Sequence, residues 1–198
     1  MELKPLTIRL GLQMPASLLV PRSFKTVFAG TLGVVGLATL TLAGSHIRIP
    51  IEPVPITLQT LFVLLAGALV GSFRGFLSQT LYVTAGLLGV PLFAGAVTGL
   101  AALSGPTGGY LVGFVLAPFV VGKLIDRRAG FPWALFVFSI GALMILALGV
   151  LHLALFYTRD VWTAMEVGLL PFAVGDAAKV FAAASIYGSY RRLRSRRQ

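Results

Sequence analysis

Cysteine is absent from this chain of 198 residues, and its absence excludes a disulfide framework, thiolate metal sites and a thiol nucleophile. Charge is also scarce, because 11% of the residues are charged, compared with about 25% in soluble domains. The phosphate-binding motif Gly-x-x-x-x-Gly-Lys-[Ser/Thr] does not occur, so we expect no ATP hydrolysis by the chain itself. No Ser-His-Asp or metal-ligand spacing stands out, and we therefore expect neither an enzyme nor a bound cofactor.

Apolar residues are abundant instead. They make up 57% of the chain, and the mean hydropathy is +0.93. A soluble domain of this size could not bury so much apolar surface. The composition therefore predicts an integral membrane protein, and it excludes a soluble globular enzyme, a disordered chain and a fibrous repeat.

Apolar segments long enough to cross a bilayer, about 20 residues each, recur along the chain. We interpret six of them as the spans of an all-α, polytopic bundle with both termini in the cytoplasm. The spans are 24–44, 57–73, 75–90, 110–125, 133–157 and 169–190. Spans two and three are nearly continuous, which predicts a tight helical hairpin broken at residues 72–75. The whole chain, 1–198, is then one transmembrane domain, with a cytoplasmic or interfacial segment (1–23), the bundle (24–190) and a basic cytoplasmic tail (191–198).

The distribution of basic residues supports this topology. With both ends inside, only Arg48 and Arg159 fall on outside loops and Lys179 falls within a span, so the other lysines and arginines are cytoplasmic. The same pattern accounts for the net charge of +10. We therefore expect a multi-pass protein of the plasma (inner) membrane, surrounded by lipid and not bound to nucleic acid.

Two outside loops are unusually apolar. Residues 46–55 contain Pro50, Pro53 and Pro55, which cannot lie in a helix interior. Residues 91–109 carry no charge. Irregular backbone near membrane depth persists only where protein buries it or where it lines a cavity. We therefore expect the first loop to be extended and packed, as a candidate lid, and a ligand cavity to open between the two loops.

Asp176 and Lys179 are the only charged residues well inside a predicted span. Their i, i+3 spacing places them on one helix face, and an intramembrane charge costs several kcal/mol unless it is paired or hydrated. The pair is either a structural link within the bundle or the polar part of a ligand site, and we favour the site. Asp176 lies about 10 Å below the outer end of its span, so the site should open outward.

Other polar groups within the spans include Gln59, Tyr82 and His152. They supply no second carboxylate, which argues against a proton relay. For His152 we favour a buried, hydrogen-bonded role over contact with a ligand. Tyr82 and Phe93 are candidates for stacking on a flat ligand, although most aromatic residues in spans serve packing or anchoring.

The first span carries small residues, Ala29, Gly30, Gly33 and Gly36. Such a face lets another helix approach closely. Packing within the bundle and docking of a partner protein both remain open.

Four stretches together resemble the BioY family, the biotin-specific substrate-binding (S) components of energy-coupling factor transporters. They are Ile49-Pro50 followed by Pro53-Val54-Pro55-Ile56-Thr57-Leu58-Gln59-Thr60, then residues 89–95 (GVPLFAG), 105–114 (GPTGGYLVGF) and 175–179 (GDAAK). They occur in the family's order, and the resemblance covers residues 24–190.

The resemblance implies an outward-facing biotin pocket in which Asp176 and Lys179 match the family's polar pair. It also implies contacts near Val97 and Thr98, although the family often has Asn or Ser where this chain has Val97. The candidate ligand-binding residues are therefore Asp176, Lys179, Thr98, Val97, Phe93, Tyr82, Gln59 and Tyr110.

The implied partners are a transmembrane coupling (T) protein and two ATPase subunits, with docking through Ala29, Gly30, Gly33 and Gly36. This glycine-containing face departs from the family's alanine-rich one. A stand-alone, proton-coupled secondary carrier for biotin is the alternative. Its weakness is that so small a chain without a second relay carboxylate has little machinery for alternating access.

Overall fold

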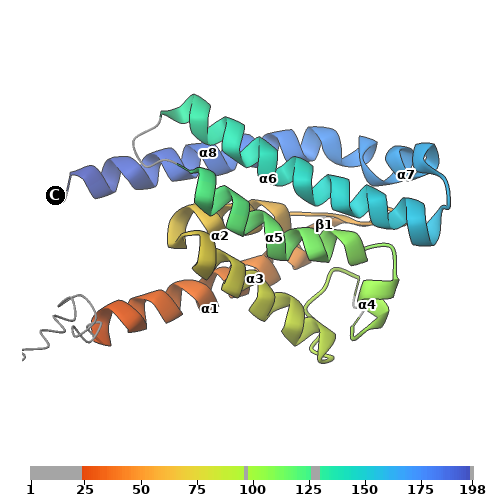
Figure 1. Cartoon of the computed structure of the whole chain (residues 1–198), viewed down its shortest axis with the longest axis horizontal. Helices are drawn as coiled ribbons and strands as arrows, with labels where there is room; N and C mark the ends of the chain where they lie inside the picture. The colour runs from red at the N-terminus through yellow and green to blue at the C-terminus, as the bar shows by residue number, and fades with distance from the viewer. Residues whose placement is uncertain (1–23, 96–97, 126–129, 197–198) are drawn as a thin grey trace, which may run out of the picture.

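The computed structural model describes residues 24–95, 98–125 and 130–196. The predictions for the N-terminal segment 1–23 and for Val97 lie outside the described residues. Within the described part the chain is almost entirely helical. Figure 1 shows α6 and α8 running along the long axis of the molecule, with α5 beside α6.

The principal helices follow the apolar segments of the sequence. They are α1 (Phe24–His46), α2 (Gln59–Val70), α3 (Ser72–Leu87), α5 (Gly108–Leu124), α6 (Phe131–His152) and α8 (Ala173–Ser195). A π-helical turn, Leu153–Tyr157, extends α6, and a 3-10 turn, Leu170–Phe172, precedes α8. Each predicted span therefore corresponds to one of these helices, with shifted ends.

Three segments of the described chain are long and apolar enough to cross a membrane, namely Val27–His46, Phe131–Tyr157 and Val161–Ser195. The apolar helices α2 and α5 are shorter, with 12 and 17 residues. Membrane-spanning character is thus clear. The count of six spans and the side on which the termini lie remain predictions.

The break between α2 and α3 lies one position earlier than predicted. Gly71 separates the two helices with φ +90°, a conformation that favours glycine, while residues 72–75 form the first turn of α3. The predicted hairpin is present. Gly67 and Gly75 face each other across it, so closely that a Cβ on Gly75 would lie 2.8 Å from the Gly67 Cα.

Glycine also brings α5 against this hairpin. A Cβ on Gly67 would collide with the Pro118 carbonyl oxygen, and a Cβ on Gly122 would collide with the backbone nitrogen of Ser72. The three helices therefore meet backbone to backbone, as small residues allow in a membrane protein. The buried apolar core continues from α2 and α5 to α6, where Val137 and Phe138 are fully buried.

The proline-rich first loop is extended, as expected, but it also forms a sheet that the all-α prediction missed. Strands β1 (Arg48–Ile49) and β2 (Ile56–Thr57) pair antiparallel, with Arg48 opposite Thr57. We call residues 48–57 the outer hairpin. The side chain of Val54, between the strands, is buried, so the outer hairpin packs on the bundle.

Two short helices lie in predicted outside loops. Helix α4 (Ala101–Ser104) interrupts the uncharged loop before α5, and α7 (Val161–Gly168) precedes α8. Asp160 caps α7 by accepting a hydrogen bond from the Thr163 backbone N–H at 2.7 Å. Both helices lie at the same end of the molecule in Figure 1.

Candidate functional site

Asp176 and Lys179 form a buried ion pair in the first two turns of α8. The Lys179 Nζ donates to Asp176 Oδ1 at 2.5 Å, and the residues are 7% and 4% exposed. Burying a charge is costly unless an opposite charge compensates it. The pair therefore keeps a carboxylate and an ammonium inside an apolar bundle, where each retains capacity for further hydrogen bonds.

A cavity of about 50 Å³ lies directly against this pair. Helices α2, α5, α6 and α8 contribute to its wall, and the outer hairpin and the loop after α3 cover it. The residues that line it are Val54, Pro55, Thr57, Gln59, Thr60, Phe93, Ala94, Thr107, Tyr110, Leu111, Phe114, Ile145, Leu146, Phe172, Asp176 and Lys179. We call this space the inner cavity.

A second space of about 350 Å³ adjoins the inner cavity on the side of the outer hairpin. The two share Pro55, Ala94 and Thr107 as lining residues. Arg48 and Glu52 of the outer hairpin also line this outer space. Arg48 and Glu52 thus stand at the hairpin side of the two spaces, and the buried ion pair lines the inner cavity. Whether the site opens outward stays a prediction.

Aromatic rings form much of the inner wall. Tyr110 and Phe172 pack with their centroids 5.8 Å apart, and the Tyr110 hydroxyl donates to the Gly168 carbonyl at 2.7 Å. A Cβ on Gly149 would collide with the Tyr110 ring, so glycine at this position makes room for the wall. Tyr110 therefore presents a fixed ring to the cavity, while its hydroxyl ties α5 to the end of α7.

Gln59, a second part of the cavity wall, is held in place by Tyr82. The Gln59 Nε2 donates to the Tyr82 hydroxyl at 2.6 Å, and that hydroxyl donates to the Leu92 carbonyl at 2.8 Å. Tyr82 also packs edge-on against Phe93, with centroids 5.7 Å apart. Among the described residues, Phe93 lines the cavity and Tyr82 does not. Tyr82 lies behind the wall, so this arrangement does not support the expected stacking on a ligand.

The remaining predicted positions lie elsewhere. Thr98 is half-buried and does not line either space, and Val97 falls outside the described residues. The ring nitrogen Nε2 of His152 lies 2.9 Å from the Gly105 carbonyl oxygen. This hydrogen bond agrees with the structural role expected for His152, because it ties α6 to the loop before α5.

Several wall residues were not singled out from the sequence. Thr60 and Thr107 lie within stretches that carry the family resemblance, and this could have drawn attention to them. Phe114 and Phe172 are aromatic residues in apolar segments, where composition does not distinguish a cavity wall from ordinary packing. Thr60 is 7% exposed and its hydroxyl has no hydrogen bond to any described residue, which leaves it free for a bound molecule.

The small residues of α1 do not share one environment. A Cβ on Gly30 would lie 2.9 Å from the Arg74 guanidinium carbon, and one on Gly33 would lie 2.8 Å from Val70. These two glycines pack against the hairpin of α2 and α3. Ala29 is exposed, and nothing lies within 4 Å of a Cβ built on Gly36. Gly30 and Gly33 therefore serve packing within the described bundle, whereas Ala29 and Gly36 leave open space on α1.

The site combines a carboxylate, an ammonium group, an amide and hydroxyls with aromatic walls. An ionised carboxylate accepts from N–H groups, and an ammonium donates to a carbonyl or carboxylate. The arrangement therefore suits a small molecule with a flat polar part and an apolar part. Such sites usually hold few polar groups among many apolar ones.

Comparison with protein families gives a match over nearly the whole chain. The model of the BioY family matches residues 20–196. Among curated proteins, the biotin transporter BioY of Thermotoga maritima is 43% identical over 147 residues, which are 74% of this chain and 86% of that protein. The probable biotin transporter BioY of Pyrococcus horikoshii is 41% identical over 147 residues, with the same shares of each chain.

The fold of this chain is similar to that of a solved structure. The crystal structure of the S-component for biotin from an ECF-type ABC transporter superposes with a TM-score of 0.79 at 26% identity. The similarity covers 88% of this chain and 95% of that chain. It therefore includes the helices that carry the cavity and not only a local motif.

Proposed function

The chain belongs to the BioY family, and on this premise we propose that it is a biotin-binding S component that captures biotin from the extracytoplasmic side. The named relatives are transporters and not enzymes, and the chain is accordingly a membrane transport protein. The observation that carries the proposal is the buried Asp176–Lys179 pair, which lies against a cavity beneath the outer hairpin.

The chemistry of biotin fits the two ends of this site. Its fused rings carry a ureido group with two N–H donors and one carbonyl, and its aliphatic arm ends in a carboxylate. Asp176 is an acceptor for the N–H donors, and Lys179 is a donor to the carbonyl or the carboxylate. Phe93 and Tyr110 line the space for the rings and arm. A molecule that leaves the buried pair without partners should bind much more weakly.

Binding requires the cavity to widen. A volume of about 50 Å³ is well below the roughly 300 Å³ at the lower end for ligand sites. The outer hairpin carries Val54, Pro55 and Thr57 of the wall. We therefore assign the opening movement to the outer hairpin, which then covers the bound biotin.

Release into the cytoplasm requires partners that supply energy. The chain has no phosphate-binding motif of its own. The proposal therefore includes a transmembrane coupling protein and two ATPase subunits, with six spans and both termini in the cytoplasm. The open space beside Gly36 on α1 supports docking of a partner helix there.

A proton-coupled carrier is not favoured by the site. Asp176 is the only buried carboxylate among the described residues, so the bundle offers no second acid to pass a proton along. Uptake of labelled biotin by the chain alone in proteoliposomes under a pH gradient separates the two functions. Gradient-driven uptake without ATPases would support the carrier.

Biotin binding by the purified chain tests the assignment directly. We expect submicromolar affinity for the wild type and a loss of at least about 30-fold for Asp176→Asn and for Lys179→Met, since truncating one partner of a buried charged contact costs 2–5 kcal/mol or more. Glu166→Gln and Arg159→Met are matched controls, because these charged residues are exposed. Absence of wild-type binding tighter than micromolar, or unchanged binding in both site variants, would refute the proposal.

A further inference from the structure

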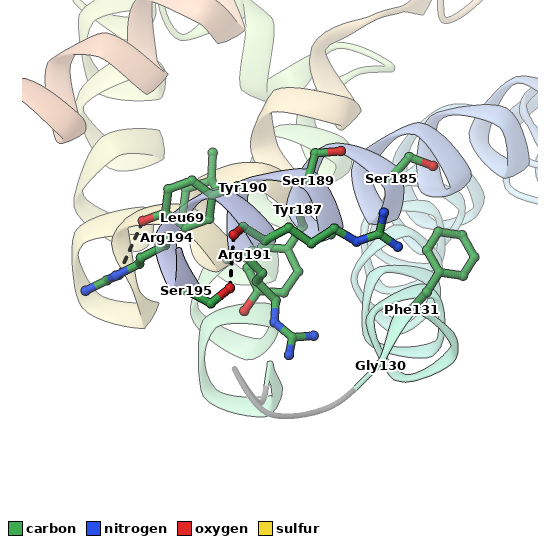
Figure 2. Close-up of a pocket in the computed structure, with 13 residues that line it drawn as sticks. Leu69, Gly130, Phe131, Ser185, Tyr187, Ser189, Tyr190, Arg191, Arg194 and Ser195 are labelled. Carbon is green, nitrogen blue, oxygen red and sulfur yellow. Dashed lines mark hydrogen bonds between the residues drawn. The ribbon is translucent and has the colours of Figure 1, made fainter. Parts of the chain in front are cut away.

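A large cavity lies at the opposite end of α8 from Asp176 and Lys179. It has a volume of about 630 Å³ and lies between the last turns of α8, the start of α6 and the end of α2. Figure 2 shows Phe131 and Gly130 on one side of this space and Leu69 on another, with α8 between them. We call it the basic cavity. It is separated from Asp176 by about 24 Å along α8, taking 1.5 Å for each of the residues from Asp176 to Arg192.

The polar lining of the basic cavity is cationic and rich in hydroxyl groups. Arg191, Arg192 and Arg194 contribute guanidinium groups, and none of the described lining residues carries a carboxylate. The lining hydroxyls belong to Ser185, Ser189, Ser195, Tyr187 and Tyr190. Guanidinium groups donate in a planar fork that matches phosphate oxygens. The Ser185 and Ser195 hydroxyls already donate to the Phe181 and Arg192 carbonyls, so the arginines are the principal donors. The lining therefore suits a phosphate group better than a neutral ligand.

Two internal hydrogen bonds organise the α8 side of this cavity. The Arg194 guanidinium donates to the Tyr190 hydroxyl at 3.3 Å, and the Ser195 hydroxyl donates to the Arg192 carbonyl at 2.9 Å (Figure 2). The Arg194 bond uses only one of the five N–H donors of a guanidinium. Arg192 and Arg194 are both exposed, so their charges can be reached from the membrane surface.

The other border of the basic cavity is apolar and faces outward. Phe131 lines the cavity and packs edge-on against Phe181, with centroids 5.5 Å apart. Phe181 is 59% exposed on the outer surface of α8. Trp133, two residues after Phe131 in α6, is also exposed, as is common for aromatic residues at the level of lipid headgroups. An acyl chain can follow these rings while its headgroup enters the cavity.

We infer that the basic cavity binds the phosphate headgroup of an anionic phospholipid, with the acyl chains lying along Phe131 and Phe181. The arginine lining and the aromatic border together indicate a lipid, because a free phosphate would contact the arginines and leave the aromatic border without a partner. Basic pockets at the ends of transmembrane helices are suited to anionic headgroups in this way. The inference does not depend on biotin binding, since the two sites use different ends of α8.

Native mass spectrometry of the purified full-length chain, mixed with phosphatidylglycerol or phosphatidylcholine, tests the inference. We expect retained phosphatidylglycerol in the wild type, at least fivefold less in the double variant Arg192→Gln/Arg194→Gln, and no comparable retention of phosphatidylcholine. Arg196→Gln is the control for charge, because Arg196 is described at the end of the same helix but does not line the cavity. Normal biotin binding by the double variant verifies that it is folded.

Three results would overturn the inference. A loss in Arg196→Gln as large as the loss in the double variant Arg192→Gln/Arg194→Gln would show diffuse attraction by the tail and not a site. Displacement of phosphatidylglycerol by equimolar glycerol phosphate would identify a free phosphate site. Failure of the wild type to retain phosphatidylglycerol would overturn the lipid assignment and leave the cationic lining to an acidic segment of a partner protein.

Discussion

The Tyr82 hydroxyl lies 2.6 Å from the Gln59 amide nitrogen and thereby joins the cavity wall on α2 to α3. The same hydroxyl donates to the Leu92 carbonyl in the loop after α3. One buried phenol thus holds two parts of the wall, although its ring lies behind Phe93. Tyr82 is best understood as a positioning residue for the site.

Tyr82→Phe should weaken biotin binding by about 5- to 30-fold, because it leaves the Gln59 amide and the Leu92 carbonyl without their shared partner, at a cost of about 1–2 kcal/mol. The ring contact with Phe93 is retained. We expect the change mainly in the dissociation rate, measured with labelled biotin. Tyr157→Phe, at an exposed tyrosine, is the control. Unchanged dissociation in Tyr82→Phe would contradict the positioning role.

The double variant Asp176→Asn/Lys179→Met should be more stable than Lys179→Met, yet it should still fail to bind biotin. Removing one partner of a buried pair leaves an uncompensated charge and costs about 3–5 kcal/mol, whereas neutralising both removes that penalty. Thermal unfolding in detergent, combined with biotin binding, measures both effects. Recovery of binding together with stability would mean that the pair serves the fold alone.

Gly67→Ala should destabilise the bundle by about 1–3 kcal/mol or more, as overpacking does. The added Cβ would meet the Pro118 carbonyl oxygen and the Gly122 backbone, which cannot rotate away. Gly36→Ala is the matched control, because nothing lies within 4 Å of its added Cβ and alanine favours a helix. Equal unfolding temperatures for the two variants would contradict the close approach of α2 and α5.

Gly36→Leu should leave folding and biotin binding of the isolated chain unchanged while reducing its co-purification with a transmembrane coupling protein. The reason is that Gly36 faces open space in this chain, so the larger side chain meets only a docked partner. Ala147→Leu on the exposed side of α6 controls for the added bulk. If co-purification is the same for both variants, the partner does not dock over Gly36.

Much of the fold was predictable because lipid imposes length and hydropathy on each long helix. The starts and ends of α1 and α6 fall within two residues of the predicted spans once the π-helical turn is counted with α6. The strands of the outer hairpin were not predictable, since two-residue strands carry no periodic signal. Helix α4 was not predicted for the same reason, because four residues are too few to show a helical repeat.

Site residues could be predicted where their type is rare in the apolar spans, and they could not be predicted where their type is common there. Asp176 and Lys179 stand out because charge is scarce in apolar spans. Phe114 and Phe172 do not stand out, because an aromatic ring in a span is usually packing. Tyr82 illustrates the intermediate case, since its type drew attention but its role depends on hydrogen bonds between segments distant in sequence.

The contact of Gly67 with Gly75, Gly122 and Pro118 has a consequence for how fast a ligand can enter. Contacts made by backbone atoms have no side-chain rotamers to rearrange, so we expect α2, α3 and α5 to move together as one rigid unit. The outer hairpin packs on these helices through side chains, including that of Val54. The association rate should therefore follow the frequency with which two short strands lift, while the rest of the scaffold stays still.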